Sequence, residues 1–188
     1  MAEHARAHGH VLLVDEAYAA FSPVNALPLL KEFDNLLIVR TFSKSHALAG
    51  MRVGYALGAP ELIDTLRRIR DSFNSYPLDC IAQAAAEASI LDEAYTAGTV
   101  ATVCAARDRC RDALRAAGIP VLTSGTNFLF VRAAREDAKP VQLALREEGI
   151  LVRHFASGRL APWLRVTVGT PEDMETVTEA LLRLCEKC

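Results

Sequence analysis

The chain has 188 residues, enough to bury a substantial core in one or two domains. Its 21 basic and 23 acidic residues give a net charge of -2, and no basic block accompanies the aromatics, so nucleic acid and anionic membranes are not expected partners. The five cysteines do not form a disulfide framework, and no apolar stretch suits a signal peptide or a membrane span. These features predict a cytoplasmic globular protein.

The first half of the chain alternates apolar strands with loops. Residues 1–9 predict the end of a helix that a glycine closes. Val11 to Val14 and the apolar run before Lys44 show no polar alternation, which predicts strands buried on both faces of a parallel sheet. Residues 16–35 between them are long enough for a right-handed crossover. A helix is predicted from Pro60 to Arg70.

The second half begins with alanine-rich residues 78–117, which predict one or two long helices. Short strands and helices then alternate, as is typical of a small α/β domain. Strands are predicted at 119–122, 127–132, 150–153 and 163–168, and helices at 140–148 and from Pro171 onward. The predicted organisation is therefore a first domain at 1–77, connecting helices at 78–117 and a small domain at 118–188.

Two segments concentrate reactive side chains: V-D-E-A-Y after the first strand, and R-T-F-S-K-S-H-A-L-A-G-M-R around the end of the second. Pyridoxal phosphate (PLP) offers a pyridine nitrogen that should stay protonated, an aldehyde that condenses with a lysine, and a phosphate that binds cations and hydroxyls. Asp15 suits the pyridine nitrogen, Lys44 suits the aldehyde, and the phosphate is matched by the set Thr41, Ser43 and Arg52. Carboxyl ends of parallel strands converge at one edge, so both segments are expected to face one ligand.

These segments, together with L-R-V-T-V-G-T near the end, resemble the fold-type-I PLP-dependent aminotransferases of class I and II, most closely the histidinol-phosphate aminotransferase branch. The resemblance covers nearly the whole chain from residue 10 onward. It implies that Lys44 is the catalytic lysine that binds the coenzyme, that Asp15 partners the pyridine nitrogen and that Tyr18 bonds the ring oxygen. It also implies that Ser43 and Arg52 bind the coenzyme phosphate.

The same resemblance implies an α/β fold: part of a large domain with a mostly parallel sheet in three αβα layers, followed by a small α/β C-terminal domain. Family members are about twice as long, so the chain is expected to be the C-terminal half and to lack the N-terminal part of the site. The implied reaction moves an amino group between histidinol phosphate, which is an amino-alcohol phosphate, and 2-oxoglutarate. This reaction belongs to histidine biosynthesis. A homodimer is implied for the full-length enzyme.

Two arginines of the second half are candidate substrate ligands. Strand alternation places Leu164 on the core face and Arg165 on the opposite face. The resemblance assigns Arg165 to the substrate carboxylate, which a planar guanidinium binds in a bidentate manner, and Arg153 to the distant anionic end. Asn127 also matches the family pattern for a substrate-binding residue.

The sequence is also compatible with other functions. A threonine-phosphate decarboxylase or another class I/II aminotransferase would keep the same PLP residues, and the chain could instead be a non-catalytic PLP-binding or dimer-partner module, or an inactive fragment. Asp15 and Glu16 also resemble a Walker B strand, but no G-x-x-x-x-G-K-[ST] loop is present. The terminal pair Cys185 and Cys188 has no second pair, and no metal site is predicted.

Overall fold

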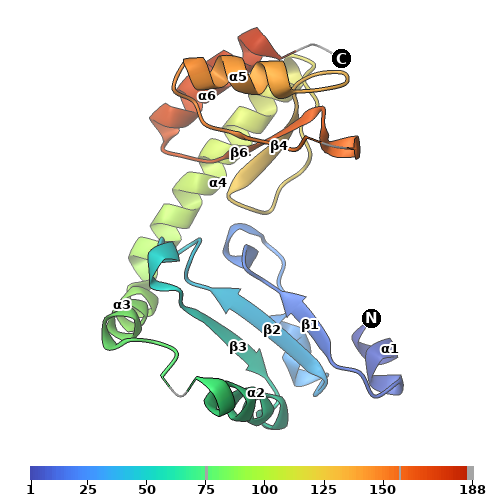
Figure 1. The fold of residues 1–188 in the computed structure, drawn as a ribbon, viewed down its shortest axis with the longest axis vertical. Coiled ribbons are helices and arrows are strands. Elements are labelled where there is room, and N and C mark those ends of the chain that lie inside the picture. The colour runs from blue at the N-terminus through green and yellow to red at the C-terminus, as the bar shows by residue number, and fades with distance from the viewer. Residues whose placement is uncertain (75, 157, 186–188) are drawn as a thin grey trace. The chain divides into compact units, whose positions relative to one another are not determined.

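The computed structural model describes residues 1–74, 76–156 and 158–185 (Figure 1). The chain divides into two compact units, Met1–Ala97 (unit 1) and Gly98–Cys188 (unit 2). The division lies inside the stretch 78–117 for which the sequence predicts connecting helices. Among the described residues, none of the helices combines the length and apolar character that crossing a bilayer requires.

Unit 1 is built on a three-stranded sheet with the order β1-β2-β3 (Figure 1). The strands are β1 (Leu12–Asp15), β2 (Leu36–Thr41) and β3 (Gly54–Gly58). The predicted parallel pairing of the first two strands is confirmed, with Leu12 opposite Leu36, whereas β3 runs antiparallel to β2. The α-helices that lie wholly in unit 1 are α1 (Ala2–Ala7), α2 (Pro60–Phe73) and α3 (Cys80–Leu91).

Burial in unit 1 is uneven. Leu36, Leu37 and Ile38 of β2 are buried, as the sequence predicts. The same prediction is wrong for β1, because Leu13 is 55% exposed. A strand face is buried only where another element packs on it, and the apolar composition of the strand does not specify that element. An apolar cluster that includes Phe42 and Ala82 joins the segment after β2 to α3.

Unit 2 packs helices on one face of a sheet with the order β4-β6-β5, all antiparallel. Its elements are α4 (Glu93–Ala116, which begins in unit 1), β4 (Phe128–Arg132), α5 (Lys139–Glu147), β5 (Arg153–His154), β6 (Trp163–Thr167) and α6 (Pro171–Leu184). Helix α6 begins with a capping box between Thr170 and Asp173. One continuous core joins these elements, with Leu129 and Leu164 completely buried.

Two predicted strands of the second half differ in the structure. At 119–122, only Val121 forms a bridge, to Val131. At 150–153, the strand begins at Arg153 instead of ending there. The physical reason is the end of α5: the Ile150 amide donates to the Leu145 carbonyl at 2.8 Å, so this apolar residue closes a helix rather than joining a sheet.

Candidate active site

The two principal candidates in unit 1 follow neighbouring parallel strands. Asp15 is the last residue of β1 and lies opposite Val39 of β2, and the Glu16 amide extends the pairing by donating to the Val39 carbonyl at 2.9 Å. Lys44 lies in the loop that follows β2, which ends at Thr41. Both side chains therefore lie at the carboxyl edge of the sheet, where ligands of α/β proteins bind.

The surroundings of Asp15 and Lys44 leave their charged groups available. The Asp15 carboxylate accepts one backbone hydrogen bond, from the Ala17 amide to Oδ1 at 2.9 Å. Lys44 is exposed, and its Nζ lies 5.6 Å from the centre of the Tyr18 ring, a cation–π distance. Neither side chain forms an ion pair with a residue that the structure describes. The structure thus brings Tyr18 and Lys44 together on one side of the unit.

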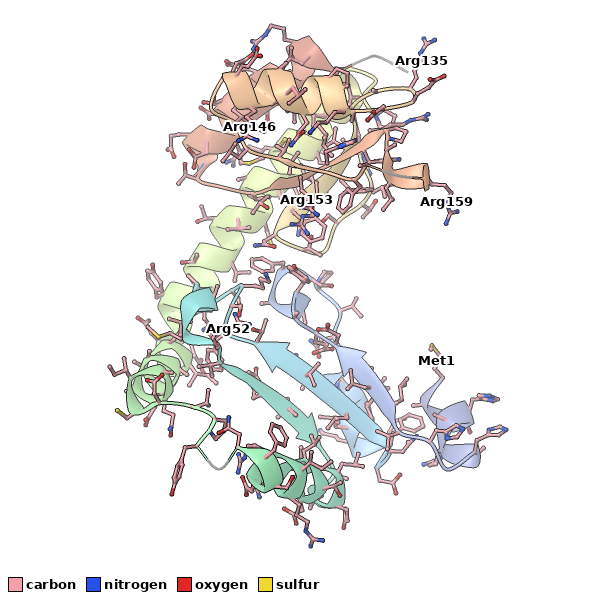
Figure 2. All side chains as sticks on the ribbon, viewed as in Figure 1. Met1, Arg52, Arg135, Arg146, Arg153 and Arg159 are labelled. Atoms are coloured by element: carbon pink, nitrogen blue, oxygen red, sulfur yellow. The ribbon has the colours of Figure 1, made fainter. Side chains whose placement is uncertain are left out.

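The segment after β2 is held in a tight, irregular conformation. Thr41 Oγ1 accepts a hydrogen bond from the Ser43 amide at 3.0 Å, and buried Phe42 anchors the loop. Arg52 adopts the left-handed conformation with φ 56°, which is uncommon for a side chain larger than glycine or asparagine. Its Nη1 donates to the Ala49 carbonyl at 2.7 Å, and Figure 2 labels the exposed Arg52 beside this turn. Such strained residues are concentrated at functional sites.

A glycine allows β3 to approach this segment. A Cβ added to Gly54 would lie 2.8 Å from the Arg40 carbonyl oxygen, closer than side chains tolerate. Gly54 pairs with Thr41, and the Phe42 amide continues the pairing by donating to the Val53 carbonyl at 3.1 Å. The glycine of the V-G-Y sequence therefore has a local steric role beside the predicted phosphate ligands.

An ion pair that the sequence did not predict links the ends of β1 and β2. Glu16 Oε2 accepts hydrogen bonds from Arg40 Nε at 3.0 Å and Nη2 at 2.7 Å, and Oε1 accepts one from the Ala26 amide. Burial alone would lower the pKa of Arg40, but hydrogen bonds to Glu16 and Tyr55 outweigh it and raise the pKa above its ordinary value. The signal in the sequence was a charged residue directly after Asp15 and another near the end of the next strand, but pairing Glu16 with Arg40 required the strand register.

A second missed contact fixes the loop that carries Lys44. His46 Nδ1 lies 2.8 Å from Ser89 Oγ of α3, and its ring centre lies 4.7 Å from that of Phe42. Burial lowers the pKa of His46, an effect that the hydrogen bond to Ser89 partly offsets. His46 is therefore a neutral tether between this loop and α3 at pH 7.

In unit 2, Arg165 lies on the face of the sheet opposite the core, as alternation predicts. Its strand neighbours Leu164 and Val166 are buried, and Arg165 lies directly opposite Arg153 of β5. Figure 2 shows Arg153 on the side of the sheet away from α5. His154, the next residue, lies 2.9 Å from Asp137 and has a side chain only 6% exposed. The arginine pair, not the histidine, occupies the open face.

The remaining predicted residues are Asn127 and the two terminal cysteines, Cys185 and Cys188. The Asn127 carbonyl accepts a hydrogen bond from the Val168 amide at 2.9 Å, which places Asn127 at the start of β4. Cys188 lies outside the described residues, and burial raises the pKa of the Cys185 thiol to about 12. A thiol with this pKa stays protonated at neutral pH, which disfavours metal or redox chemistry at this position.

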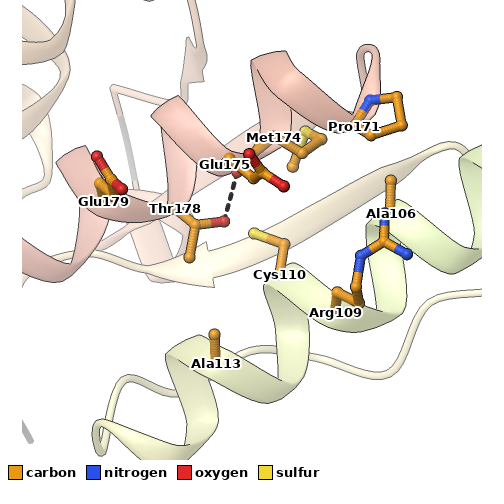
Figure 3. Close-up of a pocket in the computed structure, with 9 residues that line it drawn as sticks. All are labelled: Ala106, Arg109, Cys110, Ala113, Pro171, Met174, Glu175, Thr178 and Glu179. Atoms are coloured by element: carbon orange, nitrogen blue, oxygen red, sulfur yellow. Dashed lines mark hydrogen bonds between the residues drawn. The ribbon is translucent and has the colours of Figure 1, made fainter.

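A cavity of about 280 Å³ lies between α4 and α6 (Figure 3). Cys110 and Met174 line it, and the Thr178 hydroxyl beside them donates to the Met174 carbonyl at 2.5 Å. Burial raises the pKa of Cys110. None of the predicted coenzyme or substrate ligands lines this cavity.

The comparisons with known proteins identify the family. Residues 1–181 match the model of the aminotransferase class I and II family, so the chain belongs to that family. The histidinol-phosphate aminotransferase of Gluconacetobacter diazotrophicus is 51% identical over 91% of this chain and 48% of its own length. Histidinol-phosphate aminotransferase 2 of Thiobacillus denitrificans is 49% identical over 93% of this chain and 49% of its own length.

Solved structures agree with the fold. The histidinol-phosphate aminotransferase of Sinorhizobium meliloti in complex with pyridoxal-5'-phosphate has a TM-score of 0.80 at 29% identity, over 93% of this chain and 48% of that one. A decarboxylase from Sulfurospirillum multivorans has a TM-score of 0.78 at 24% identity, over 96% of this chain and 54% of that one. The predicted α/β fold class is confirmed. The chain spans about half the length of the curated relatives it matches.

Proposed function

We propose that this chain carries the coenzyme-attaching part of a PLP-dependent aminotransferase that acts on histidinol phosphate and 2-oxoglutarate in histidine biosynthesis. The observation that carries the proposal is the placement of Asp15 and Lys44 at the adjacent carboxyl ends of two parallel strands. Relatives about 50% identical to the chain are named histidinol-phosphate aminotransferases, which supports the choice of substrate.

The donor set at this edge fits PLP group by group. Asp15 offers a carboxylate with one backbone donor, suited to keeping a pyridine nitrogen protonated. Lys44 offers an exposed amine with no carboxylate partner among the described residues. Thr41, Ser43 and Arg52 offer hydroxyls and a guanidinium for a phosphate. Tyr18 offers a hydroxyl for the ring oxygen, and its ring lies near Lys44.

PLP, when bound, supplies an aldehyde that condenses with amines and a ring that accepts electrons from the substrate Cα. Lys44 would hold the coenzyme through its amine, and the free amine of Lys44 would accept the proton that leaves the substrate Cα. Asp15 would keep the ring nitrogen protonated. The Tyr18 hydroxyl would donate a hydrogen bond to the ring oxygen.

Arg165 and Arg153 bind the anionic groups of the substrate in this proposal, with Asn127 nearby at the start of β4. The support is their position on the open face of the unit 2 sheet and the absence of an acidic partner for either arginine among the described residues. A guanidinium binds a carboxylate or a phosphate through two parallel hydrogen bonds, which orients the substrate as well as attracting it.

Part of the proposal concerns the whole enzyme. A cytoplasmic location is proposed, supported by the free cysteines Cys80, Cys104, Cys110 and Cys185 and by the composition. A homodimer is proposed because the family resemblance implies one. A threonine-phosphate decarboxylase is the second candidate, because such an enzyme would keep the same predicted PLP ligands, Asp15, Lys44 and Arg52. Product analysis separates the two: transamination yields glutamate from 2-oxoglutarate, whereas decarboxylation releases carbon dioxide.

Coenzyme attachment is tested by incubating the chain with PLP, reducing with borohydride and mapping modified peptides by mass spectrometry. We expect modification at Lys44 in large excess over Lys31 and Lys139, which serve as internal controls on other surfaces of the chain. Lys44→Arg should abolish the specific label, and Asp15→Asn should weaken PLP binding. Equal labelling of Lys31, Lys44 and Lys139 would contradict the coenzyme site. A transamination assay with histidinol phosphate then tests the substrate.

A further inference from the structure

The arginine pair of unit 2 has an unfavourable arrangement for a protein without a ligand. Arg153 and Arg165 are directly opposite each other on antiparallel strands, where side chains lie about 5 Å apart at Cβ. Like charges in this position repel each other and destabilise a sheet. Neither arginine forms an ion pair with an acidic side chain that the structure describes.

Each guanidinium instead lies over an aromatic ring. Arg165 Cζ is 5.4 Å from the centre of the Phe128 ring, and Arg153 Cζ is 5.8 Å from that of Phe155. Phe128 lies on the same face of β4 as Phe130, and we call Phe128, Phe130, Phe155 and Trp163 the aromatic surface. Within it, Phe130 is stacked on Trp163 at 5.2 Å and meets Phe155 edge-on at 5.7 Å.

An aromatic partner and an acidic partner have different consequences for binding. A carboxylate would occupy the N–H donors of an arginine, whereas a ring face attracts the charge and leaves the donors in the guanidinium plane unused. The buried Nε of Arg165 has no hydrogen-bond partner in the described chain. The donors of the pair are thus available to an anion, which would also relieve the repulsion between the two charges.

We infer that Phe128 and Phe155 are positioning residues that hold Arg165 and Arg153 side by side, charged and with free donors, for one doubly charged group such as a phosphate monoester. The inference rests on the proposed function for the presence of a phosphorylated substrate. It adds that the aromatic surface, and not an acidic residue, stabilises the arginines before the substrate binds. Loss of either ring face should therefore weaken anion binding although the arginine remains.

Trp163 provides the measurement, because it is the single tryptophan of the chain and is stacked within the aromatic surface. The 188-residue chain is titrated with inorganic phosphate at constant ionic strength while Trp163 fluorescence is recorded. We expect a saturable change, weakened about two- to fivefold by Phe128→Leu and by Phe155→Leu, as the loss of one cation–π contact implies. Phe128→Tyr and Phe155→Tyr keep a ring face and should restore near-normal affinity. Arg165→Gln should weaken binding more than any of these.

The control is Phe73→Leu, a similar substitution of a 78% exposed residue in unit 1, which should leave the titration unchanged. Leucine variants that bind phosphate as the unaltered chain does, while Arg165→Gln does not, would overturn the inference and leave the proposed function intact. Equal weakening by leucine and tyrosine would also overturn it, because packing rather than a ring face would then be responsible. No phosphate response in the unaltered chain would overturn both the inference and the substrate-anion assignment. Specific PLP labelling of Lys44 tests the coenzyme site separately.

Discussion

The two units differ in how completely they bury their apolar side chains. In unit 2, Leu129, Leu145 and Leu164 are 0% exposed and belong to one continuous core. In unit 1, helix α2 buries no residue, and Phe73 at its end is 78% exposed. The unit that carries Asp15 and Lys44 therefore gains less from apolar burial than the unit that carries the arginine pair.

This difference changes what holds the candidate site together. Around Lys44, positions depend on directed polar contacts, such as Glu16 with Arg40 and His46 with Ser89. Around Arg165, the strand is fixed by the core beneath it, and the open face can carry repelling charges. Functional groups are thus supported by hydrogen bonds in unit 1 and by packing in unit 2. Substitutions that remove one kind of support at a time test this contrast.

The largest expected effect is in the core of unit 2. Leu164→Ala should lower the free energy of unfolding of unit 2 by about 2 to 5 kcal/mol, because it removes buried methyl groups and leaves a cavity. Leu13→Ala in β1 makes the same chemical change at a position that is 55% exposed, and it should cost less than about 0.5 kcal/mol. Denaturant unfolding followed by Trp163 fluorescence and by circular dichroism measures both. Equal losses of unfolding free energy for Leu164→Ala and Leu13→Ala would contradict the difference in burial between the two units.

A smaller effect is expected from the ion pair of unit 1. Glu16→Gln keeps the shape of a side chain that is 6% exposed but removes the charge that Arg40 contacts, so unit 1 should lose about 1.5 to 3 kcal/mol of stability. The Trp163 transition, which reports on unit 2, should not move. Asp71→Asn removes the partner of Arg70 in a pair that is about half exposed, and it should change stability much less than Glu16→Gln does, because solvent screens an exposed ion pair. If Glu16→Gln lost no more stability than Asp71→Asn does, the ion pair of Glu16 with Arg40 would contribute little to the stability of unit 1.

Much of the site could be predicted because its signals are local in the sequence. Strand ends follow from apolar runs, so the parallel pairing of the strands that precede Glu16 and Lys44 followed from two runs and a connection of sufficient length. The outward direction of Arg165 followed from alternation against Leu164 and Val166. The roles of these residues in binding PLP and substrate stay predictions.

The features that were missed depend on register and on tertiary contacts. Glu16 and Arg40 pair because the second strand passes beside the first at a particular offset, which no single segment specifies. The same holds for Arg153, which lies opposite Arg165 only because β5 starts later than its apolar run predicts. The exposure of Leu13 was missed because composition shows that a strand is apolar but not whether another element covers it.

The smallest expected effect is a pH dependence of unit 1 that passes through His46. Burial holds the pKa of this histidine below its ordinary value of 6.5, so the unfolded chain binds a proton more readily than the folded one. Stability should therefore be fully present above pH 6.5 and decrease as the pH falls below it toward the lower folded pKa. His46→Gln removes this titration, so the melting temperature of the variant should depend less on pH between pH 7.5 and 5.5 than that of the unaltered chain. The two melting temperatures are compared at each pH with a precision of about one degree. His4→Gln, at a residue on α1, is the matched control and should reproduce the unaltered profile. If both variants behave alike, the contact of His46 with Ser89 does not couple protonation to the Lys44 loop, and the other contacts of that loop, including the packing of Phe42, hold it.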